Sequence, residues 1–384
     1  MANNNENKVL NVPHLRFPEF SGEWDSFKLV ELGKFIGGGT PSSSNLSFWT
    51  GSIPWISSSD IKEDNINNIS ISRYITEDAI EKSATKYCPA PVILIVSRVG
   101  VGKVALSHTS LCTSQDFCNI IDIKCHPVFL SYNLLRTMKR KSREVQGTSI
   151  KGITSDELQK IRVFIPKNKD EQNKISNLLT LLDERIATQN KIIEDLKKLK
   201  SAISLKMLHS DSWEQFKIQD IASIGRGRVI SSVEISQQEN PLYPVYSSQT
   251  SNDGIMGYLD DFMFEGEYIS WTTDGANAGT VFYRNGKFNC TNVCGLLKLK
   301  KGFDAHFVSL VLAEATRMYV STNLANPKLM NNTMGNIQIR LPKLEEQKRI
   351  SVVFRKLHGL LETHNSLIIK YSKQKQYLLS QMFI

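Results

Sequence analysis

Apolar residues recur at a coiled-coil spacing between residues 169 and 209, in a stretch that contains neither proline nor glycine. The steps between them alternate between four and three residues, which is the 3.5-residue period of a seam that packs against another helix. The seam consists of Ile175, Leu179, Leu182, Ile186, Ile193, Leu196, Ile203 and Met207, with polar residues at Gln189 and Lys200. The pattern predicts one long helix with an apolar stripe.

The same seam recurs 175 residues further along the chain, in residues 344–384. Its members are Ile350, Phe354, Leu357, Leu361, Ile368, Tyr371, Leu378 and Met382, and the polar breaks recur as His364 and Lys375. Two stripes of equal length are most simply buried against each other, which predicts an antiparallel pair of helices within one chain. A second interpretation stays open, in which each helix dimerises with another molecule.

The segments that precede the two helices repeat each other as well. Residues 24–29 read WDSFKL and residues 213–218 read WEQFKI, and both continue through an apolar helical turn into a glycine-rich loop. A strand, a glycine-containing turn and a second strand follow in residues 92–105 and again in residues 268–281. The repeat predicts an α+β fold in which two globular domains are joined by two long antiparallel coiled-coil helices with pseudo-twofold symmetry.

These patterns divide the chain into five segments. We expect a disordered lead-in over residues 1–16, a first globular domain over 17–168, a first long helix over 169–209, a second globular domain over 210–343 and a second long helix over 344–384. The spacing of the helices is kept while the two globular domains differ in length and loop sequence. One scaffold therefore carries two unlike domains.

The charge of the chain favours a polyanionic partner. Its 384 residues include 47 Lys and Arg against 38 Asp and Glu, a net charge of +9. The isoelectric point is near 9.1. Such a balance raises the expectation of nucleic-acid binding without proving it.

Composition also limits the cellular compartment and the metal chemistry. The longest apolar runs are too short to cross a bilayer, and the Asn-rich N-terminus lacks the apolar core of a signal peptide. The six cysteines form no CxxC pair and have no histidine at ligand spacing, so we expect reduced, buried thiols and no metal site. These features predict a cytoplasmic protein.

Two short motifs suggest an enzyme. Residues 35–39 fit F-x-G-x-G, and residues 240–243, NPLY, resemble the N-P-P-Y motif of adenine methyltransferases. A nucleotide-binding glycine loop needs a buried strand before it and a helix N-terminus after it, whereas this loop continues into TPSSSN. No metalloprotease, nucleophile-elbow or P-loop motif occurs. Methyl transfer by the chain itself stays an alternative, although the physical context disfavours it.

Glycine-rich loops, serine-rich turns and clustered cations supply candidate phosphate and base contacts. Their alternatives are tight turns that need a positive φ, and solvated charged surfaces. The candidate DNA-binding residues are Gly38, Gly39, Thr40, Ser42, Ser57, Ser58, Arg98, Lys103, Arg140, Lys141, Lys151, Arg226, Arg228, Ser247, Ser248, Asn277 and Lys328.

The order of W-x-x-F-K-[LI], G-G-G-T-P-S, S-R-V-G-V-G-K-V-A and I-P-x…E-Q-x-x-I, together with the repeat, resembles the specificity subunit of type I restriction-modification enzymes. The second half departs from this pattern in its glycine loops. The resemblance covers nearly the whole chain. It implies two target-recognition domains that each read one part of a split DNA sequence, and no catalysis in this subunit. It also implies two modification subunits that methylate adenine with S-adenosylmethionine, and restriction subunits that use ATP and Mg²⁺.

Two other functions stay open beside this one. An adenine methyltransferase in its own right would bind S-adenosylmethionine as an isolated chain. A coiled-coil scaffold with carbohydrate- or protein-binding domains would show no salt-dependent affinity for duplex DNA. The bases read, the gap between half-sites and the helix face that meets the partner do not follow from the residues.

Overall fold

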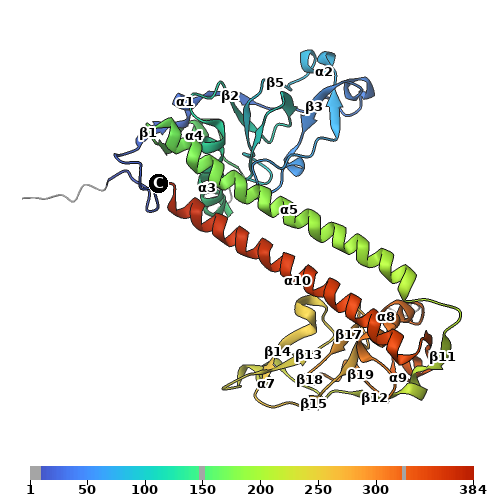
Figure 1. Ribbon diagram of the computed structural model, residues 1–384. Helices are drawn as coiled ribbons and strands as arrows, with labels where there is room; N and C mark the ends of the chain where they lie inside the picture. The colour runs from blue at the N-terminus through green and yellow to red at the C-terminus, as the bar shows by residue number, and fades with distance from the viewer. Residues whose placement is uncertain (1–9, 147–151, 322–325) are drawn as a thin grey trace, which may run out of the picture. The chain divides into compact units, whose positions relative to one another are not determined.

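The computed structural model describes residues 10–146, 152–321 and 326–384 (Figure 1). The chain folds into two compact units, residues 1–190 with 366–384 and residues 191–365. We call them the first and the second unit. Each unit contains one globular domain and a part of each long helix, so each is described by itself.

The globular part of the first unit contains two four-stranded sheets and one two-stranded sheet. The strand orders are β2-β9-β6-β7, β4-β3-β8-β5 and β1-β10, and all pairs are antiparallel except β3 with β8. The strands are β1 (Asp25–Lys28), β2 (Lys34–Gly37), β3 (Ile53–Ile56), β4 (Arg73–Ile75), β5 (Tyr87–Cys88), β6 (Val92–Ile95), β7 (Val104–Ser107), β8 (Leu111–Thr113), β9 (Cys118–Ile121) and β10 (Arg162–Ile165).

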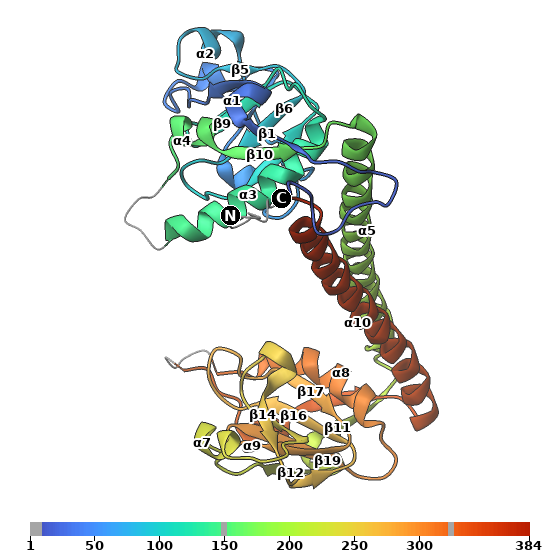
Figure 2. The same ribbon diagram turned by 90° about the vertical axis from the view of Figure 1, so that its left-hand side faces the viewer.

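Helices cover the first of these sheets. Strand β6 is an uninterrupted apolar run and every residue of it is buried, as expected for a strand covered on both faces. Helix α3 (Pro127–Gln146) packs on β6 and β7 and lies along one side of the strands in Figure 2. The shorter helices are α1 (Leu29–Leu32), α2 (Glu77–Glu81) and α4 (Ser155–Lys160), with 3₁₀ turns η1 (Leu46–Trp49) and η2 (Ser58–Asp60).

The second unit repeats this topology strand for strand. Its sheets have the orders β12-β19-β16-β17, β14-β13-β18-β15 and β11-β20, which are the first orders shifted by ten labels. The strands are β11 (Glu214–Lys217), β12 (Ala222–Arg226), β13 (Tyr243–Tyr246), β14 (Ile255–Leu259), β15 (Phe264–Glu265), β16 (Tyr268–Thr272), β17 (Val281–Arg284), β18 (Lys287–Cys290), β19 (Cys294–Leu299) and β20 (Gln338–Leu341). The predicted α+β class and internal repeat are confirmed.

The helical parts of the two units differ more than the sheets. The second unit contains α6 (Ile218–Ile221), α7 (Ser232–Ser236), α8 (Ala305–Ala315), α9 (Asn331–Asn336), η3 (Ser251–Gly254) and η4 (Thr316–Met318). Helix α8 takes the place of α3 in chain order but has 11 residues instead of 20. The scaffold is therefore repeated while the elements around it are varied.

The two predicted long helices are α5 (Lys169–Met207) and α10 (Leu344–Gln381). All twelve of the predicted core positions from Ile175 to Leu196 and from Ile350 to Tyr371 are buried or half-buried. In the first unit Asp183 pairs with Lys375 while Arg185 contacts Tyr371, so the residue numbers run in opposite directions. The helices are antiparallel there, as predicted.

The second unit contains the other ends of the two helices. Ile203 and Met207, near the end of α5, pack against the apolar core that includes Ile350 and Phe354 near the start of α10. This again joins the end of one helix to the start of the other. The seam is thus satisfied within the chain in both units, as the intramolecular interpretation expected.

A glutamine near the start of each long helix fastens the helix to its globular domain. In the first unit Gln172 accepts a hydrogen bond from the His126 N–H (2.9 Å) and donates one to the Pro166 carbonyl (2.9 Å). In the second unit Gln347 makes the same pair of bonds with the Asp304 N–H (2.9 Å) and the Pro342 carbonyl (2.8 Å). Both glutamines are buried, and so are their bonds to the two proline carbonyls, which satisfies backbone groups shielded from water.

The predicted lead-in over residues 1–16 falls partly outside the described residues, which begin at residue 10. Its described part is held in place, which differs from the disorder expected for it. The Leu15 N–H donates to the Gln381 carbonyl (2.9 Å), and Arg16 forms a bidentate pair with the buried Glu171 (2.7 and 2.8 Å). A polar composition did not reveal these two partners, because both lie more than 150 residues away.

Replacing one seam leucine in each unit, Leu182 or Leu357, by aspartate tests the helix pairing. We expect each variant to lose about 3 kcal/mol or more of unfolding free energy, because a carboxylate replaces a buried apolar side chain. Thermal or urea unfolding measures the loss. The matched controls are Leu181→Asp and Leu360→Asp, since these side chains are 56% and 47% exposed. Equal melting of seam and control variants would contradict the pairing.

Candidate nucleic-acid interface

Three loops of the first unit meet at one end of its first sheet. Gly38 follows β2, Arg98 follows β6 and Gln115 lies between β8 and β9, and all three line a cavity of about 660 Å³. The Thr40 hydroxyl donates a hydrogen bond to Gln115, which joins the first loop to the third. Arg98 is exposed and has no hydrogen-bond or ion-pair partner among the described residues. The structure therefore brings together predicted residues that are sixty positions apart.

The glycines of the first loop are required by close packing. A Cβ atom at Gly38 would lie 2.0 Å from the Ser114 carbonyl oxygen, and one at Gly39 would lie 2.4 Å from Ala84. Neither glycine has a positive φ, so the expected alternative of a left-handed tight turn does not apply. The loop needs glycine because it passes directly over the neighbouring backbone.

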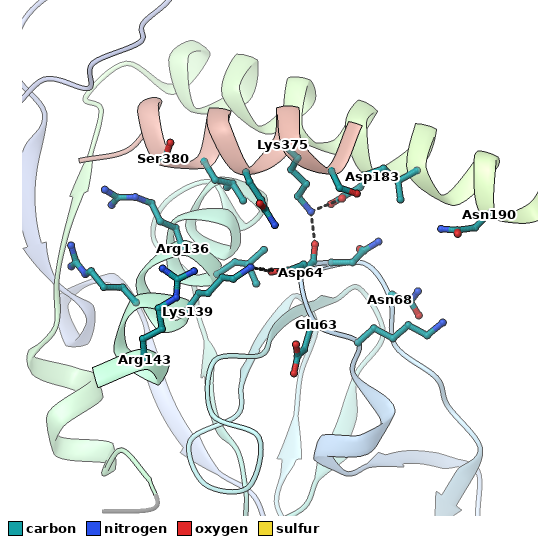
Figure 3. Close-up of a pocket in the computed structure, with 18 residues that line it drawn as sticks. Glu63, Asp64, Asn68, Arg136, Lys139, Arg143, Asp183, Asn190, Lys375 and Ser380 are labelled. Carbon is teal, nitrogen blue, oxygen red and sulfur yellow. Dashed lines mark hydrogen bonds and ion pairs between the residues drawn. The ribbon is translucent and has the colours of Figure 1, made fainter. Parts of the chain in front are cut away.

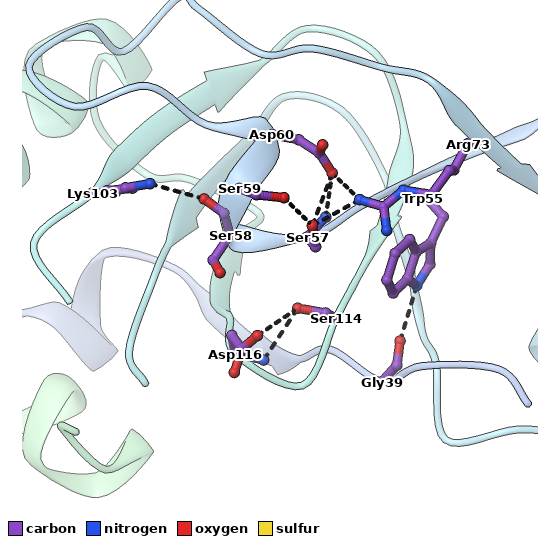
Figure 4. Close-up of polar contacts among 10 residues, drawn as sticks. All are labelled: Gly39, Trp55, Ser57, Ser58, Ser59, Asp60, Arg73, Lys103, Ser114 and Asp116. Atoms are coloured by element: carbon purple, nitrogen blue, oxygen red, sulfur yellow. Dashed lines mark hydrogen bonds and ion pairs between the residues drawn. The ribbon is translucent and has the colours of Figure 1, made fainter. Parts of the chain in front are cut away.

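The serine turn after β3 is braced from within (Figure 4). The Ser57 hydroxyl receives a hydrogen bond from Arg73 (2.7 Å), whose guanidinium also pairs with Asp60 and lies 4.6 Å from the Trp55 ring. The Lys103 ammonium donates to the Ser58 carbonyl (3.1 Å). These contacts hold the turn in one conformation. Ser57 and Lys103 therefore help to shape the turn, and they are also candidates for contact with a ligand.

Not all predicted cations of the first unit belong to this region. Arg140 and Lys141 lie on α3, and Arg140 lines a different cavity, on the side of α3 that faces the long helices. Ser42 is exposed and its hydroxyl bonds to that of Ser44 (2.7 Å). Lys151 lies outside the described residues. Arg140 therefore lines a different cavity from Arg98, although α3 packs at Ser142 against the turn that contains Gly102.

The arginines of the second unit have partners within the protein. Arg226 donates through Nε to the Asn331 side chain (2.9 Å), and Arg228 forms an ion pair with Glu234. The Arg228–Glu234 ion pair is only slightly buried. The hydrogen bond from Arg228 lowers the pKa of the Glu234 carboxyl. Contact with a phosphate would have to compete with Glu234 for Arg228, which weakens the simple interpretation of this loop as an open phosphate cradle.

The other predicted residues of the second unit lie on the loops after β13 and β16 or pair with them. Lys328 pairs by its backbone with Asp274, which begins the turn that contains the exposed Asn277. Ser247 and Ser248 follow β13 and are half-buried, and the Ser247 N–H donates to the Gly254 carbonyl (2.9 Å). The loops after β13 and β16 thus correspond to the loops after β3 and β6.

Motif analysis missed Arg73 and its functional counterpart Arg284. The Arg284 side chain is 2% exposed, stacks on Tyr246 with 3.6 Å to the ring centre, and pairs with Asp253 (2.9 Å). It therefore supports the turn that begins at Ser247, as Arg73 supports the one at Ser57. Neither arginine lies in a motif, because its role arises from the pairing of strands distant in sequence.

The two enzyme-like motifs lie in unsuitable surroundings. The strand before the Gly37–Gly39 loop is antiparallel to β9, and the next helical element after the loop is the 3₁₀ turn η1. In NPLY, Leu242 is 71% exposed at the start of β13. Neither motif forms a strand–loop–helix cradle for a nucleotide.

The thiols and carboxylates of the described ranges form no metal site. No three His, Cys, Asp or Glu side chains gather there as a metal site would require. All six cysteines are unpaired, and burial raises the pKa of the Cys88 thiol to about 11. In the same parts of the chain, no helix is long and apolar enough to cross a membrane.

A family model described as the type I restriction modification DNA specificity domain matches the chain twice, over residues 21–198 and 210–370. The specificity subunit of the type I restriction enzyme MpnII from Mycoplasma pneumoniae is 41% identical over 177 residues, 44% of this chain and 53% of that protein. The specificity subunit of MjaIX from Methanocaldococcus jannaschii is 33% identical over 186 residues, 46% of this chain and 42% of that protein. Each alignment spans about half of the relative.

The fold also resembles a solved structure over almost its whole length. The S subunit of the type I restriction-modification system from M. genitalium superposes with a TM-score of 0.69 at 18% identity. The superposition covers 97% of this chain and 99% of the other. At 18% sequence identity, this similarity is evidence for a shared fold alone.

Replacing Arg98 by alanine tests the interface of the first unit. We expect about tenfold weaker binding of duplex DNA, and a slope of log K against log salt that is smaller by about one, because one cation–phosphate contact is removed. Fluorescence anisotropy over a salt series measures both. The control is Arg162→Ala, since Arg162 is an exposed arginine on β10 that does not line the cavity at the three loops. Equal losses in the two variants would remove Arg98 from the interface.

Proposed function

Since the chain belongs to the type I restriction-modification DNA specificity family, we propose that it reads an asymmetric, bipartite DNA target and directs methylation and cleavage by partner subunits. The predicted family is confirmed by the two matches of the family model. Its relatives are specificity subunits, so this chain supplies recognition and no catalysis of its own. The chemistry belongs to other subunits.

The proposal of a bipartite target rests on one observation: a repeated scaffold carries two sets of loops that differ from each other. The strand orders of the two units are identical. The loop after β6 carries the exposed Arg98, whereas the equivalent loop after β16 begins with Asp274. Arg226 and Arg228, at the end of β12 and just after it, are engaged by Asn331 and Glu234, where the equivalent loop after β2 carries glycines. Unlike contact groups on equivalent loops would read unlike half-sites.

We assign residues 17–168 and 210–343 as the two target-recognition domains, and the helices over 169–209 and 344–384 as the spacer between them. In this assignment the helix pair sets the gap between half-sites. Base edges would be read in the DNA grooves by side chains of the loops after β3, β6, β13 and β16. Cations such as Arg98 and Lys328 would contact phosphate and supply salt-dependent affinity.

The repeated helices suit two copies of one partner, because equivalent surfaces occur twice. We assign this partner as an adenine methyltransferase subunit that binds S-adenosylmethionine. Restriction subunits, which use ATP and Mg²⁺ for translocation and cleavage, would join that assembly. No cofactor is assigned to this chain.

Methylation-site sequencing of genomic DNA tests the proposal. The cells would carry this chain with its neighbouring modification subunit, and the control cells would lack only this chain. We expect an adenine methylation motif of two unlike halves with a fixed gap, present only when the chain is present. If no motif depended on the chain, the specificity function would be wrong. Methylation by the isolated chain with S-adenosylmethionine would favour the methyltransferase alternative instead.

A further inference from the structure

A cavity of about 530 Å³ lies within the first unit, and its lining shares no residue with the cavity at Gly38, Arg98 and Gln115. Helix α3 forms one wall, the segment over residues 62–68 forms another, and adjoining parts of α5 and α10 close it (Figure 3). We call it the α3 cleft. Arg136, Lys139 and Arg143 reach towards it from α3, while Lys375 and Ser380 line it from α10.

The α3 cleft carries an excess of positive charge. Six cationic and three acidic side chains line it, a net charge of +3: Lys62, Arg136, Lys139, Arg140, Arg143 and Lys375 against Glu63, Asp64 and Asp183.

Part of this charge is neutralised internally. Lys139 pairs with the Asp64 carboxylate (2.8 Å), and Arg136 donates to the main-chain oxygen of Ile384 (2.7 Å). The side chains of Lys62, Arg140 and Arg143 make no hydrogen bond or ion pair with any other residue that the structure describes. Arg140 and Arg143 are exposed on α3, one turn apart, so both can approach the same anionic group or segment.

A network of buried hydrogen bonds and one ion pair holds the side of the cleft at Lys375. Lys375 is 5% exposed and pairs with Asp183, which is 4% exposed, and its ammonium also donates to the Asp64 carbonyl (2.6 Å). The Tyr132 hydroxyl donates to the other oxygen of Asp183 (2.8 Å). Burial lowers the pKa of Lys375, and the nearby Asp183 carboxylate opposes that shift. A satisfied network of this kind keeps the cleft open and its shape defined.

Three side chains in the lining of the cleft are apolar. Leu135 is buried, and Ile186 and Leu379 are half-buried within the lining. A lining that combines apolar side chains with exposed cations matches a peptide that carries an apolar side chain beside carboxylates. Duplex DNA carries its phosphates on the outside of a stiff rod, so it could reach the cations but would leave the apolar side chains uncovered.

Among the described residues, the second unit has no equivalent of this basic wall, and the turn η4 that continues α8 adds the single cation Arg317. Helix α8, which takes the place of α3 in the second unit, has the sequence AHFVSLVLAEA and carries no Lys or Arg. The residue 175 positions after Asp183 is His358, which is exposed and lies 3.2 Å from Glu362. Two identical partners bound to the repeated helices would therefore not both find this surface.

We propose that the α3 cleft binds one acidic segment of a partner protein per chain, with carboxylates at Arg140 and Arg143 and an apolar side chain on Leu135, Ile186 and Leu379. This inference rests on the proposed function in one respect, namely that the partner belongs to the restriction-modification assembly. In this proposal Arg140 binds a protein carboxylate, whereas the sequence pattern predicts contact with DNA.

Site-specific photo-cross-linking tests the occupant. A benzophenone amino acid replaces Gln376, which lines the cleft, in the full chain assembled with its modification and restriction subunits and a duplex that carries the methylated motif. The control places it at Gln374, an exposed glutamine of the same helix outside the lining. We expect the Gln376 probe to join a partner-protein peptide that mass spectrometry identifies as acidic. Arg140→Glu with Arg143→Glu should reduce that product at least tenfold and leave the base sequence of the methylated motif unchanged.

Three results would overturn the inference: a cross-link to DNA alone, a yield equal to that of the Gln374 probe, or a peptide product unaffected by the charge reversal. Arg140→Gln with Arg143→Gln replaces the charge-reversed variant if its melting temperature falls. The wild-type assembly is tested in parallel for binding to the bipartite duplex. Failure there would contradict the proposed function, whereas failure of the cross-link alone contradicts only the cleft.

Discussion

The apolar seam of α5 and α10 is the interaction on which the rest of the structure depends. Full burial of one leucine or isoleucine contributes about 1.5–3 kcal/mol, so a long helix with its whole seam exposed would forgo a large stabilisation. The seam residues of both helices are buried or half-buried. Because the two helices are 175 residues apart in sequence, burying their seams also requires the chain to return on itself, and this brings distant segments into each unit.

The two glutamine clamps extend this constraint to the globular domains. Gln172 and Gln347 satisfy backbone groups of the segments before the helices, with nearly identical distances in the two units. Anchored in this way, the sheets keep one topology while loops and covering helices differ. Exposed loops tolerate such change because few buried contacts depend on them. A repeated frame with variable loops is what a protein needs to combine two recognition specificities.

The periodic features of the chain were predictable from sequence, whereas contacts across the sheets were not. The 3.5-residue spacing predicted both helices, their pairing and the buried seam, and the internal repeat predicted equivalent domains. Arg73 and Arg284 were missed because their partners come from strands whose register no motif encodes. The partners of Arg226 and Arg228, Asn331 and Glu234, likewise depend on packing. The first glycine loop was recognised from the sequence. The structure shows that Gly38 and Gly39 are required there because the loop passes close to neighbouring backbone.

The central claim is that each domain reads its own half of the target, and a domain duplication tests it most directly. In this chimera residues 24–167 replace residues 213–343, so that each helix follows a copy of the first domain. Both exchanged segments begin at the repeated tryptophan and end at the repeated Pro-Lys. Methylation-site sequencing should then yield a motif made of two inverted copies of the first half-site. A folded chimera that retained the original asymmetric motif would contradict the account.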